Sequence, residues 1–569
     1  MFNNFGEGYL LIATGTEKDS ASRASFSHTD WLIVALLALA AIVFLAAHVT
    51  RPITPMEDAS MLLRYSQNFA RGHGIVWNVG EKPVEGATDF LFMVAVGCFS
   101  RLTKVGVQES AMGILFVSQV ATVVLLYAGL RRIYDTPRFL AICFAATMGA
   151  GLGYRYINTA FSPPFYALFA LLTWLVGMEC VVNGVTWKRA IWFGIFAFVT
   201  GLVRPDGVFL AGFMLCSTLY GVKGRRLPLL ISFGLIFAVC GGVYFGWRLH
   251  YFGYAFPNPF YIKRISRVEF SSLKLSARIF VELLLPLLPL AGLGIRSRAA
   301  FRQLSIWLIT VVPFTAIWMI VSLDNNHFSR FQYVMVPLSL LSLGGVVAVW
   351  WNGLKREQPQ LVQQLKLPLI GASVLLFGIT IFYNMHLYVA PFSNVGGQQL
   401  ALRLKPYASK NYTMVVTEAG DIPFYSEWRA IDAYGLNDAY IAHHNNGIVS
   451  EAYLEKYRPE IIMYRVWAEY RSVKEFEAQS GGDPVPSTDK LTEDDIILNR
   501  YAVRHGYILA ALWGSTYCDY HKYWVRPDFA DSAAIVSAIR DHPYYTQQTG
   551  QLSYDFRDAP VPSIPCSVN

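Results

Sequence analysis

The stretch from residue 57 to residue 88 holds the residues best suited to chemistry. It opens with two adjacent carboxylates, Glu57 and Asp58, shortly after the first apolar run of the chain. Charged groups at the edge of a bilayer are costly to desolvate, so they are seldom placed there without a function. A carboxylate in such a place can act as a general base toward a hydroxyl group. The stretch therefore predicts binding or catalysis at the outer face of a membrane.

Four further polar loops fall on the same predicted side of the membrane. They contain Arg155; Arg204 and Asp206; Lys263 and Arg264; and Asp324, His327 and Arg330. Lys263 and Arg330 lie on the side where the positive-inside rule disfavours cations. An anion that offsets their charge would explain their position. Carboxylates and cations that face one cavity suit an anionic, lipid-anchored substrate whose head group reacts at the interface.

The composition is that of a membrane protein. Of 569 residues, 54% are hydrophobic and only 15% are charged, against about 25% in soluble proteins. Apolar runs near the ~20 residues needed to cross a bilayer recur up to about residue 388. We predict eleven spans, at about 31–49, 111–130, 139–154, 164–184, 190–203, 207–221, 228–247, 275–295, 304–323, 331–351 and 367–388. The net charge of +8 does not indicate nucleic-acid binding, because the basic residues lie in loops between spans.

The direction of the spans follows from short basic loops, which stay in the cytoplasm. The clusters are Arg131, Arg132 and Arg138; Lys188 and Arg189; Lys223, Arg225 and Arg226; Arg296, Arg298 and Arg302; and Lys355, Arg356 and Lys366. Eleven spans with a cytoplasmic N-terminus place every cluster inside. This requires that the apolar run 89–102 does not cross. We expect it to be an interfacial helix on the outer leaflet.

The predicted fold class is an α-helical polytopic membrane protein with a C-terminal extracytoplasmic α/β domain. We expect a cytoplasmic leader over 1–30, a transmembrane module over 31–388 with a first outer loop at 50–110, and the outer domain over 389–569. In that domain, 412–417 and 460–464 indicate strands and 532–540 a helix. Its only cysteines are Cys518 and Cys566, and an oxidising compartment would permit a disulfide between them.

The chain resembles the GT-C class of membrane glycosyltransferases, and within it the branch that contains the mycobacterial terminal arabinofuranosyltransferase. The motifs that carry the resemblance are Glu57-Asp58-Ala59, Arg64-Tyr65 with Asn68, Gly72-His73-Gly74-Ile75-Val76-Trp77-Asn78, Val84-Glu85-Gly86, Arg204-Pro205-Asp206-Gly207, Pro257-Asn258, Phe260-Tyr261, Lys263, His327, Arg330-Phe331, Glu418-Ala419-Gly420-Asp421, and Asp432 to Asp438. Together they cover most of the chain, in the same order as the spans.

The resemblance implies transfer of a sugar from a polyprenyl-phosphate donor, with arabinofuranose as the sugar of that branch. The acceptor would be a cell-envelope glycan or protein, and inversion at the anomeric carbon is implied. Asp58 would be the base, with Glu57 beside it. The implied substrate-binding residues are Arg64, His73, Trp77, Glu85, Arg204, Tyr261, Lys263, His327 and Arg330. The implied location is the bacterial plasma (inner) membrane, with the active site outside the cytoplasm.

One position departs from the family pattern. Relatives often carry an acidic residue near the place where this chain has Phe161-Ser162-Pro163-Pro164. A second acid or metal ligand is therefore in doubt. No cofactor is indicated with certainty, and the use of a divalent metal stays open.

Simpler interpretations exist for several of these residues. Asp58 could be the N-cap of a helix that begins at Ala59, and Glu85 could belong only to a turn. His73 could be structural, and Arg204 could anchor the end of a span. Two other functions also compete: a flippase or transporter of a lipid-linked saccharide, and an envelope-assembly scaffold. Transporters place polar residues near the bilayer midplane and often contain internal repeats. Here the polar residues cluster in outer loops and no repeat is found.

Overall fold

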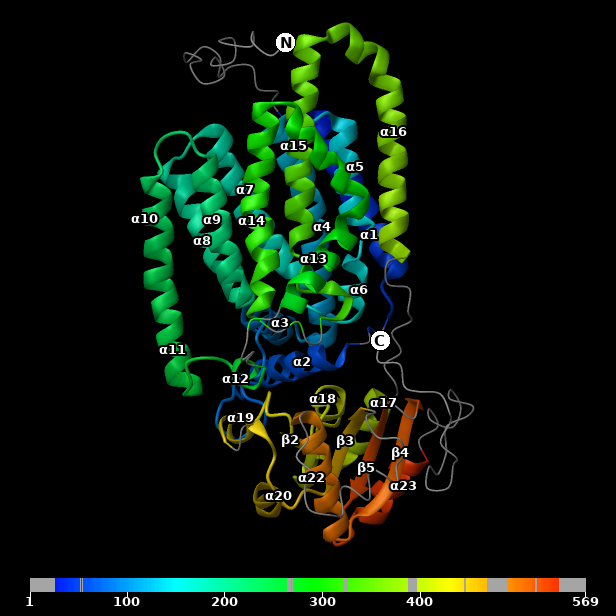
Figure 1. Cartoon of the computed structure of the whole chain (residues 1–569). Coiled ribbons are helices and arrows are strands. Elements are labelled where there is room, and N and C mark those ends of the chain that lie inside the picture. The colour runs from blue at the N-terminus through cyan, green and yellow to red at the C-terminus, as the bar shows by residue number, and fades with distance from the viewer. Residues whose placement is uncertain are drawn as a thin grey trace.

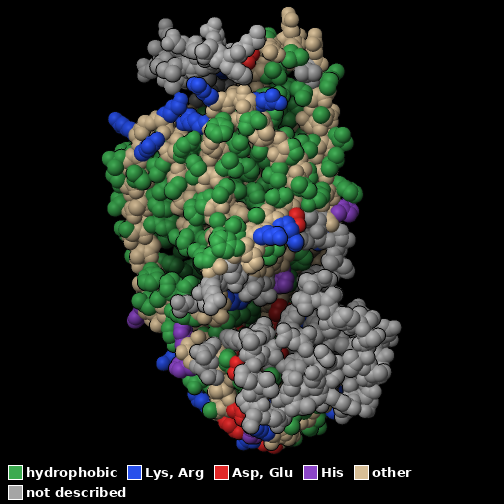
Figure 2. Space-filling view, viewed as in Figure 1, with side chains coloured by type: hydrophobic (Ala, Val, Ile, Leu, Met, Phe, Trp, Pro, Cys, Tyr) green, Lys and Arg blue, Asp and Glu red, His purple; other side chains and the backbone are tan. Residues whose placement is uncertain are grey.

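The computed structural model describes residues 26–51, 53, 55–263, 268, 270–321, 323, 326–386, 397–444, 447–467, 490–516 and 519–541. A module of long helices is joined at one end to a smaller domain that contains a β-sheet (Figure 1). Hydrophobic side chains cover the sides of the helical module, as membrane exposure requires (Figure 2). The predicted division into a membrane module and a C-terminal α/β domain is visible in this arrangement.

Nine helices in the described ranges are long and apolar enough to cross a membrane. They are α1 (His28–His48), α4 (Val107–Tyr134), α5 and α6 (Arg138–Gly149 and Gly153–Asn158), α7 (Pro163–Asn183), α10 to α11 (Leu227–Ile236 and Gly242–Phe252, joined by a π-helical turn), α13 (Phe270–Leu284) with a following 3₁₀ segment, α14 (Arg298–Ala316), α15 (Met335–Glu357) and α16 (Pro359–His386). Each corresponds to a predicted span.

The other two predicted spans are the shorter helices α8 (Trp187–Val203) and α9 (Asp206–Gly221). They have 17 and 16 residues, which at 1.5 Å per residue is about 25 Å, below the ~30 Å of a bilayer core. Both nevertheless lie within the bundle (Figure 1). Hydroxyl contacts join them to their neighbours: Thr200 lies 3.1 Å from Thr173, and Ser217 lies 2.6 Å from Thr310. Such interhelical hydrogen bonds are a common means of association in lipid.

Two short helices lie at the end of the module that meets the sheet domain. These are α2 (Glu57–Ala70) and α3 (Phe90–Thr103), each of 14 residues. At about 21 Å neither can cross a bilayer, in keeping with the expectation that 89–102 is not a span. Helix α2 begins at Glu57, and its N-cap is Met56. Asp58 is therefore inside the first turn, so the interpretation of Asp58 as an N-cap is wrong.

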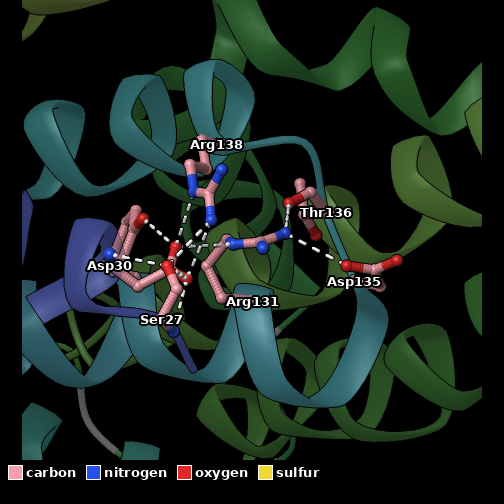
Figure 3. A network of polar contacts seen from close by, with 7 residues as sticks. Ser27, Asp30, Arg131, Asp135, Thr136 and Arg138 are labelled. Atoms are coloured by element: carbon pink, nitrogen blue, oxygen red, sulfur yellow. Dashed lines mark hydrogen bonds and ion pairs between the residues drawn. The ribbon is translucent and has the colours of Figure 1, made fainter. Parts of the chain in front are cut away.

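The opposite end of the module is held by a buried carboxylate on α1. Asp30 accepts hydrogen bonds from Arg131, at 3.1 Å, and from Arg138, at 3.0 Å, and also contacts Ser27 (Figure 3). Arg131 also bonds Asp135 and the carbonyl of Thr136. Two members of the first basic cluster thus have a carboxylate partner, which joins α1 to α4 and to the start of α5.

The sheet of the C-terminal domain has five strands in the order β2-β1-β3-β5-β4. The strands are β1 (Thr413–Val416), β2 (Arg429–Asp432), β3 (Ile461–Trp467), β4 (Ile508–Thr516) and β5 (Asp519–Val525). Strands β2, β1 and β3 pair in parallel, and β5 is antiparallel to both of its neighbours, β3 and β4. Strands predicted over 412–417 and 460–464 correspond to β1 and β3, and the predicted helix over 532–540 is α23 (Ser532–Arg540).

Alternating residues of the strands pack into two different cores. Met414 and Val416 face the core shared with the helical module, whereas Val415 faces a second core. This is the two-residue period of a strand buried on both faces. The helices of the domain are α17 (Gly397–Leu404), α18 (Asp421–Ser426), α19 (Ala439–His443), α20 (Glu451–Tyr457), α22 (Lys490–Arg504) and α23. Because one core is continuous with the helical module, the two parts are packed together.

The segment between α2 and α3 covers the edge of the sheet. Asn78 accepts from the backbone amide of Ala430 and donates to its carbonyl, both at 3.0 Å, and the Trp77 indole donates to the same carbonyl at 2.8 Å. Strand β2 is the edge strand, whose backbone groups would otherwise lack partners. An amide side chain therefore takes the place of a neighbouring strand and fixes the domain to the membrane module.

Candidate active site at the membrane interface

Asp58 lies at the junction between the membrane module and the C-terminal domain. Its carboxylate is 2.5 Å from the guanidinium of Arg330, 272 residues away in the chain. Burial raises the pKa of Asp58, but the positive charges of Arg330 and Lys263 outweigh it, and the pKa is lowered overall. The first turn of a helix also favours a negative charge. Asp58 is therefore ionised and able to accept a proton.

Arg330 is fixed by aromatic rings and has a donor to spare. Its guanidinium lies 4.2 Å from the ring of Phe161 and 5.1 Å from that of Phe331. Its Nε is buried and has no hydrogen-bond partner in the described part of the chain. Phe161 belongs to the segment 161–164, where the family resemblance led us to look for a carboxylate. An aromatic ring in contact with Arg330 lies there instead.

A strained turn presents Arg330 to the site. Phe328 has φ +53° and Ser329 has φ +59°, two successive non-glycine residues in the left-handed region. Such conformations cost on the order of 1–3 kcal/mol each and persist where the surroundings enforce them, often at functional sites. The hydroxyl of Tyr156 donates to the carbonyl of Phe328 at 2.6 Å and helps to hold the turn.

Lys263 and His327 complete the surroundings of Asp58. Lys263 follows the short helix α12 (Asn258–Ile262), which is anchored because the amide of Asn258 donates to the carbonyl of Glu85 at 3.0 Å. The pKa of His327 is lowered by desolvation and then by the positive charge of Arg330, with further contributions from Lys263 and Arg465. His327 is therefore a neutral imidazole within a group of cations.

Glu57 is directed away from this group and toward the C-terminal domain. Its carboxylate accepts from the amide of Asp421 at 3.0 Å and from that of Gly420. Burial raises its pKa well above the ordinary value, and the negative charges of Asp421 and Glu418 raise it further. Adjacent residues of a helix point about 100° apart, so Glu57 and Asp58 serve different partners. The structure does not bring the two carboxylates together.

Arg204 has two carboxylate partners of its own. Its Nε donates to Asp206 at 3.0 Å, and one terminal nitrogen lies 3.2 Å from Asp89. Ser162 also donates to Asp89. The side chains of this ion-pair network are almost fully buried. The positive charge of Arg204 is therefore compensated within the protein.

Arg64 and Trp77 join the two parts of the molecule. The guanidinium of Arg64 donates to the carbonyls of Trp77, at 2.9 Å, and Trp428, at 2.7 Å, and also to the carbonyl of Pro423 and to Asn78. It lies 4.5 Å from the centre of the Trp77 ring. Both side chains are buried. Their donors are thus engaged by the protein itself.

The remaining predicted site residues lie around this junction. Glu85 pairs with Arg248 of α11 at 2.6 Å, and burial raises the pKa of Glu85 while Arg248 opposes the shift. The ring of Tyr261 meets His443 of the C-terminal domain at 4.4 Å. His73 is exposed between two glycines with positive φ. Of the predicted set, Asp58, Lys263, His327 and Arg330 form one group.

Sequence reasoning missed Asp89, Arg248, Arg465 and His521. The signal for Asp89 was its place directly before an apolar helix, and that for Arg248 was a cation near the outer end of a span. Nothing in the sequence pairs Arg465 with His521. In the described residues, no group of three or more His, Cys, Asp or Glu side chains is arranged to hold a metal ion. Arg264, Asp324, Cys518 and Cys566 lie outside the described residues.

Comparison with known proteins bears on the fold. Residues 387–524 match a family described as a domain of unknown function (DUF8728). No curated protein matches the chain. Among solved structures, the chain is similar to ArnT from Cupriavidus metallidurans in the apo state, with a TM-score of 0.56, 13% identity, and coverage of 87% of this chain and 98% of that one.

The structure of the same protein bound to undecaprenyl phosphate gives a TM-score of 0.52 at 11% identity, with the same coverage. The oligosaccharyltransferase AglB from Archaeoglobus fulgidus, in complex with an inhibitory peptide and a dolichol-phosphate, gives 0.48 at 10% identity and covers 90% of this chain and 77% of that one. The chain is thus a membrane protein with the GT-C fold: a polytopic helical module followed by a sheet-containing C-terminal domain.

Proposed function

We propose that this protein transfers a sugar from a polyprenyl-phosphate donor to a hydroxyl group of a cell-envelope glycan or protein. The observation that carries the proposal is the group around Asp58: one ionised carboxylate, two cations and a neutral imidazole at the membrane end of the C-terminal domain. The similar structure of ArnT with undecaprenyl phosphate supports a lipid-phosphate carrier.

The chemistry needs one base and a place for a departing phosphate. Asp58 takes the proton of the acceptor hydroxyl, whose oxygen then bonds to the anomeric carbon. The bond between that carbon and the phosphate oxygen breaks, and the phosphate leaves with the electron pair. A single displacement of this kind inverts the anomeric centre. A positioned base contributes about 10²–10⁴-fold, and fixed cations stabilise the charge on the leaving group.

Charge compensation indicates which cations hold the phosphate. Arg204 is bonded to Asp89 and Asp206 and is therefore a positioning residue in this proposal. Lys263 and Arg330 both act on the charge of Asp58, and the Nε of Arg330 has no hydrogen-bond partner in the described part of the chain. A phosphate bound to Arg330 would compete with Asp58 for the guanidinium. The pKa of Asp58 would then rise, and its carboxylate would become a stronger base. The base would then become effective only when the donor is present.

The finer identity of the substrates rests on the family resemblance. Arabinofuranose is the donor sugar that the resemblance suggests. We place the site on the extracytoplasmic face of a bacterial plasma membrane, because Lys and Arg side chains gather at the end of the module remote from the C-terminal domain (Figure 2). A reporter fused after Asn569 would then be extracytoplasmic and one fused after Arg132 cytoplasmic, and the reverse result would reject this orientation.

Turnover by the purified protein tests the function. Full-length protein in lipid nanodiscs is incubated with labelled polyprenyl-phosphate arabinofuranose and a cell-envelope glycan extract, and the product is identified by mass spectrometry. Asp58→Asn should reduce transfer at least 100-fold and still bind undecaprenyl phosphate. Near-normal transfer by Asp58→Asn would remove Asp58 from the mechanism. Donor binding without any transfer by the unmodified protein would favour a transporter.

A further inference from the structure

Arg155 lies on α6, at the end of the helical module nearer the C-terminal domain (Figure 1). Its side chain is half-buried. The guanidinium donates to the hydroxyl of Tyr154 at 3.1 Å and to the carbonyl of Met385 on α16 at 3.3 Å. Arg204 and Arg330 each form an ion pair with a carboxylate, whereas Arg155 forms none with the described residues. That part of the chain therefore leaves the charge of Arg155 uncompensated.

The surroundings of Arg155 are the ends of three membrane spans. The spans of α1, of α5 with α6, and of α16 end at His48, Asn158 and His386. Met385 is the last residue but one of α16, and the ring of Tyr154 lies 5.4 Å from that of His48. Only 17% of the apolar stretch of α1, and the same share of that of α16, is buried inside the protein, so both helices are exposed to lipid. Arg155 thus lies between two lipid-facing helices, at the depth of the phospholipid head groups.

A cation in this position favours a nearby anion. A charged group at the edge of the bilayer is costly to desolvate, and the positive-inside rule disfavours arginine on the outer side. Phospholipids place phosphate groups at this depth, and basic residues close to the surface attract anionic lipids. Two N–H groups of the guanidinium are used by Tyr154 and Met385. The others can bind the oxygens of a phosphate in parallel.

Helix α6 also contacts the segments that carry the proposed base and its cation. The hydroxyl of Tyr156, the residue after Arg155, donates to the carbonyl of Phe328 in the strained turn before Arg330. The carbonyl of Thr159, the C-cap of α6, accepts the amide of Met56 at 3.1 Å. Met56 is the N-cap of α2, whose first turn contains the base. A ligand that fixes α6 would therefore fix both segments.

We propose that Arg155 binds the phosphate of an anionic phospholipid of the bilayer, and that this lipid holds α6 in place behind the active site. The second part rests on the proposed function. The donor phosphate belongs to Arg330 and Lys263 in that proposal, so the phosphate at Arg155 is a second one. A zwitterionic phospholipid carries its own cation beside the phosphate, whereas an anionic one leaves its charge to Arg155. Arg155 is thus a positioning residue, which acts through Tyr156 and Thr159.

Direct lipid binding tests the site without a transfer assay. Purified full-length protein in detergent is mixed with phosphatidylglycerol or phosphatidylcholine, and the affinity for the first bound lipid is measured by native mass spectrometry. We expect a preference for phosphatidylglycerol. Arg155→Gln should weaken its binding about 5-fold, the effect of one basic residue near an anionic membrane surface. Arg278→Gln is the matched control: it removes the same charge, but Arg278 is paired with Glu282 on α13 at 3.2 Å.

Transfer in nanodiscs tests the effect of the lipid on the active site. The bilayer is phosphatidylcholine alone or phosphatidylcholine with phosphatidylglycerol. We expect phosphatidylglycerol to accelerate transfer several-fold in the unmodified protein and in Arg278→Gln, and to leave Arg155→Gln at the lower rate. Binding of undecaprenyl phosphate should be the same in all three proteins, because its phosphate belongs to Arg330 and Lys263.

Equal phosphatidylglycerol binding by Arg155→Gln and Arg278→Gln would overturn the lipid site. Displacement of the lipid by excess inorganic phosphate would show a site for free phosphate instead. Loss of undecaprenyl phosphate binding in Arg155→Gln would assign Arg155 to the donor site and also overturn the inference. Transfer that does not respond to phosphatidylglycerol would reject the link to the active site.

Absence of transfer by the unmodified protein in every bilayer would instead count against the proposed function, and the binding measurements would still decide the lipid site. If Arg155→Gln lacks a thermal unfolding transition, Arg155→Lys takes its place. A lysine keeps the charge but lacks the planar fork of the guanidinium. Phosphatidylglycerol binding should then weaken, and an unchanged affinity would overturn the contact between Arg155 and the lipid phosphate.

Discussion

Gly420 meets the backbone of Glu57 so closely that a side chain at this position would collide with the Glu57 carbonyl. The contact joins the loop after β1 to the first turn of α2, which also carries Asp58. Because the carboxylate of Glu57 accepts the amides of Gly420 and Asp421, the loop fixes the helix turn by both backbone and side chain. The C-terminal domain thereby takes part in positioning the proposed base.

Gly420→Ala should therefore reduce transfer more than it reduces folding. The added methyl group must push the loop away from α2, and overpacking of this kind costs about 1–3 kcal/mol. We expect the melting temperature to fall by a few degrees and kcat to fall at least 10-fold, because Asp58 is displaced with its helix. Gly353→Ala on α15 is the control, since a methyl group there meets no atom within 4 Å. Unchanged kcat in Gly420→Ala would show that the loop does not position Asp58.

The raised pKa of Glu57 predicts that stability decreases as the pH rises. Above its ordinary pKa of 4.5, the folded protein keeps a proton on Glu57 that the unfolded chain has lost. Stability then falls with rising pH until the raised folded pKa is passed. Glu57→Gln removes the titrating group, so its melting temperature should depend less on pH. Melting curves from pH 5 to pH 8 for both proteins check this, and identical slopes would contradict it.

Arg330→Lys should impair use of the donor. A lysine ammonium cannot contact Asp58 and a phosphate with the fixed geometry of a guanidinium. We expect the KM for the polyprenyl-phosphate sugar to rise and kcat to fall, so that kcat/KM decreases at least 10-fold. Lys263→Ala should act in the same direction. Arg458→Lys, at an exposed ion pair with Asp528, is the matched control. If only the acceptor dependence changes, the phosphate lies elsewhere.

Asp89→Asn should affect folding and leave donor affinity unchanged. The substitution weakens one of the two carboxylate contacts of buried Arg204, at a cost on the order of 1–3 kcal/mol. The melting temperature should therefore fall without a change in donor KM. Asp135→Asn is the control. The Asp135 side chain, which contacts Arg131, is largely exposed, so this substitution should have little effect. A lower donor KM or tighter phosphate binding in Asp89→Asn would instead assign Arg204 to the donor site.

The membrane module was predictable because lipid imposes strong rules on sequence. Apolar runs located the helices, and the exclusion of 89–102 from the spans depended only on its length and on the basic clusters. The strands β1 and β3 were also predictable from short apolar runs. Nine of the eleven expected spans are long apolar helices in the described residues, whereas α8 and α9, although slightly longer than the predicted spans 190–203 and 207–221, have only 17 and 16 residues.

The partners of the site residues were not predictable, because they come from distant parts of the chain. The sequence indicated that Asp58 and Arg330 matter, but not that they touch across 272 residues. It also placed Glu57 beside Asp58 as a pair. Adjacency in sequence says little about direction on a helix, and in the structure the two side chains have different partners. The role of Arg204 was hidden because one partner, Asp89, is far away in the sequence, at the N-cap of α3, and had no motif of its own.

The contacts of Arg64, Trp77 and Asn78 with the C-terminal domain have an evolutionary consequence. The atoms that they bind there are backbone carbonyls and an amide of Pro423, Trp428 and Ala430. Recognition of backbone constrains the path of a chain but not the identity of its side chains. The domain can accordingly diverge in sequence, and with it the choice of molecule to be modified, while the same membrane module continues to hold it in place.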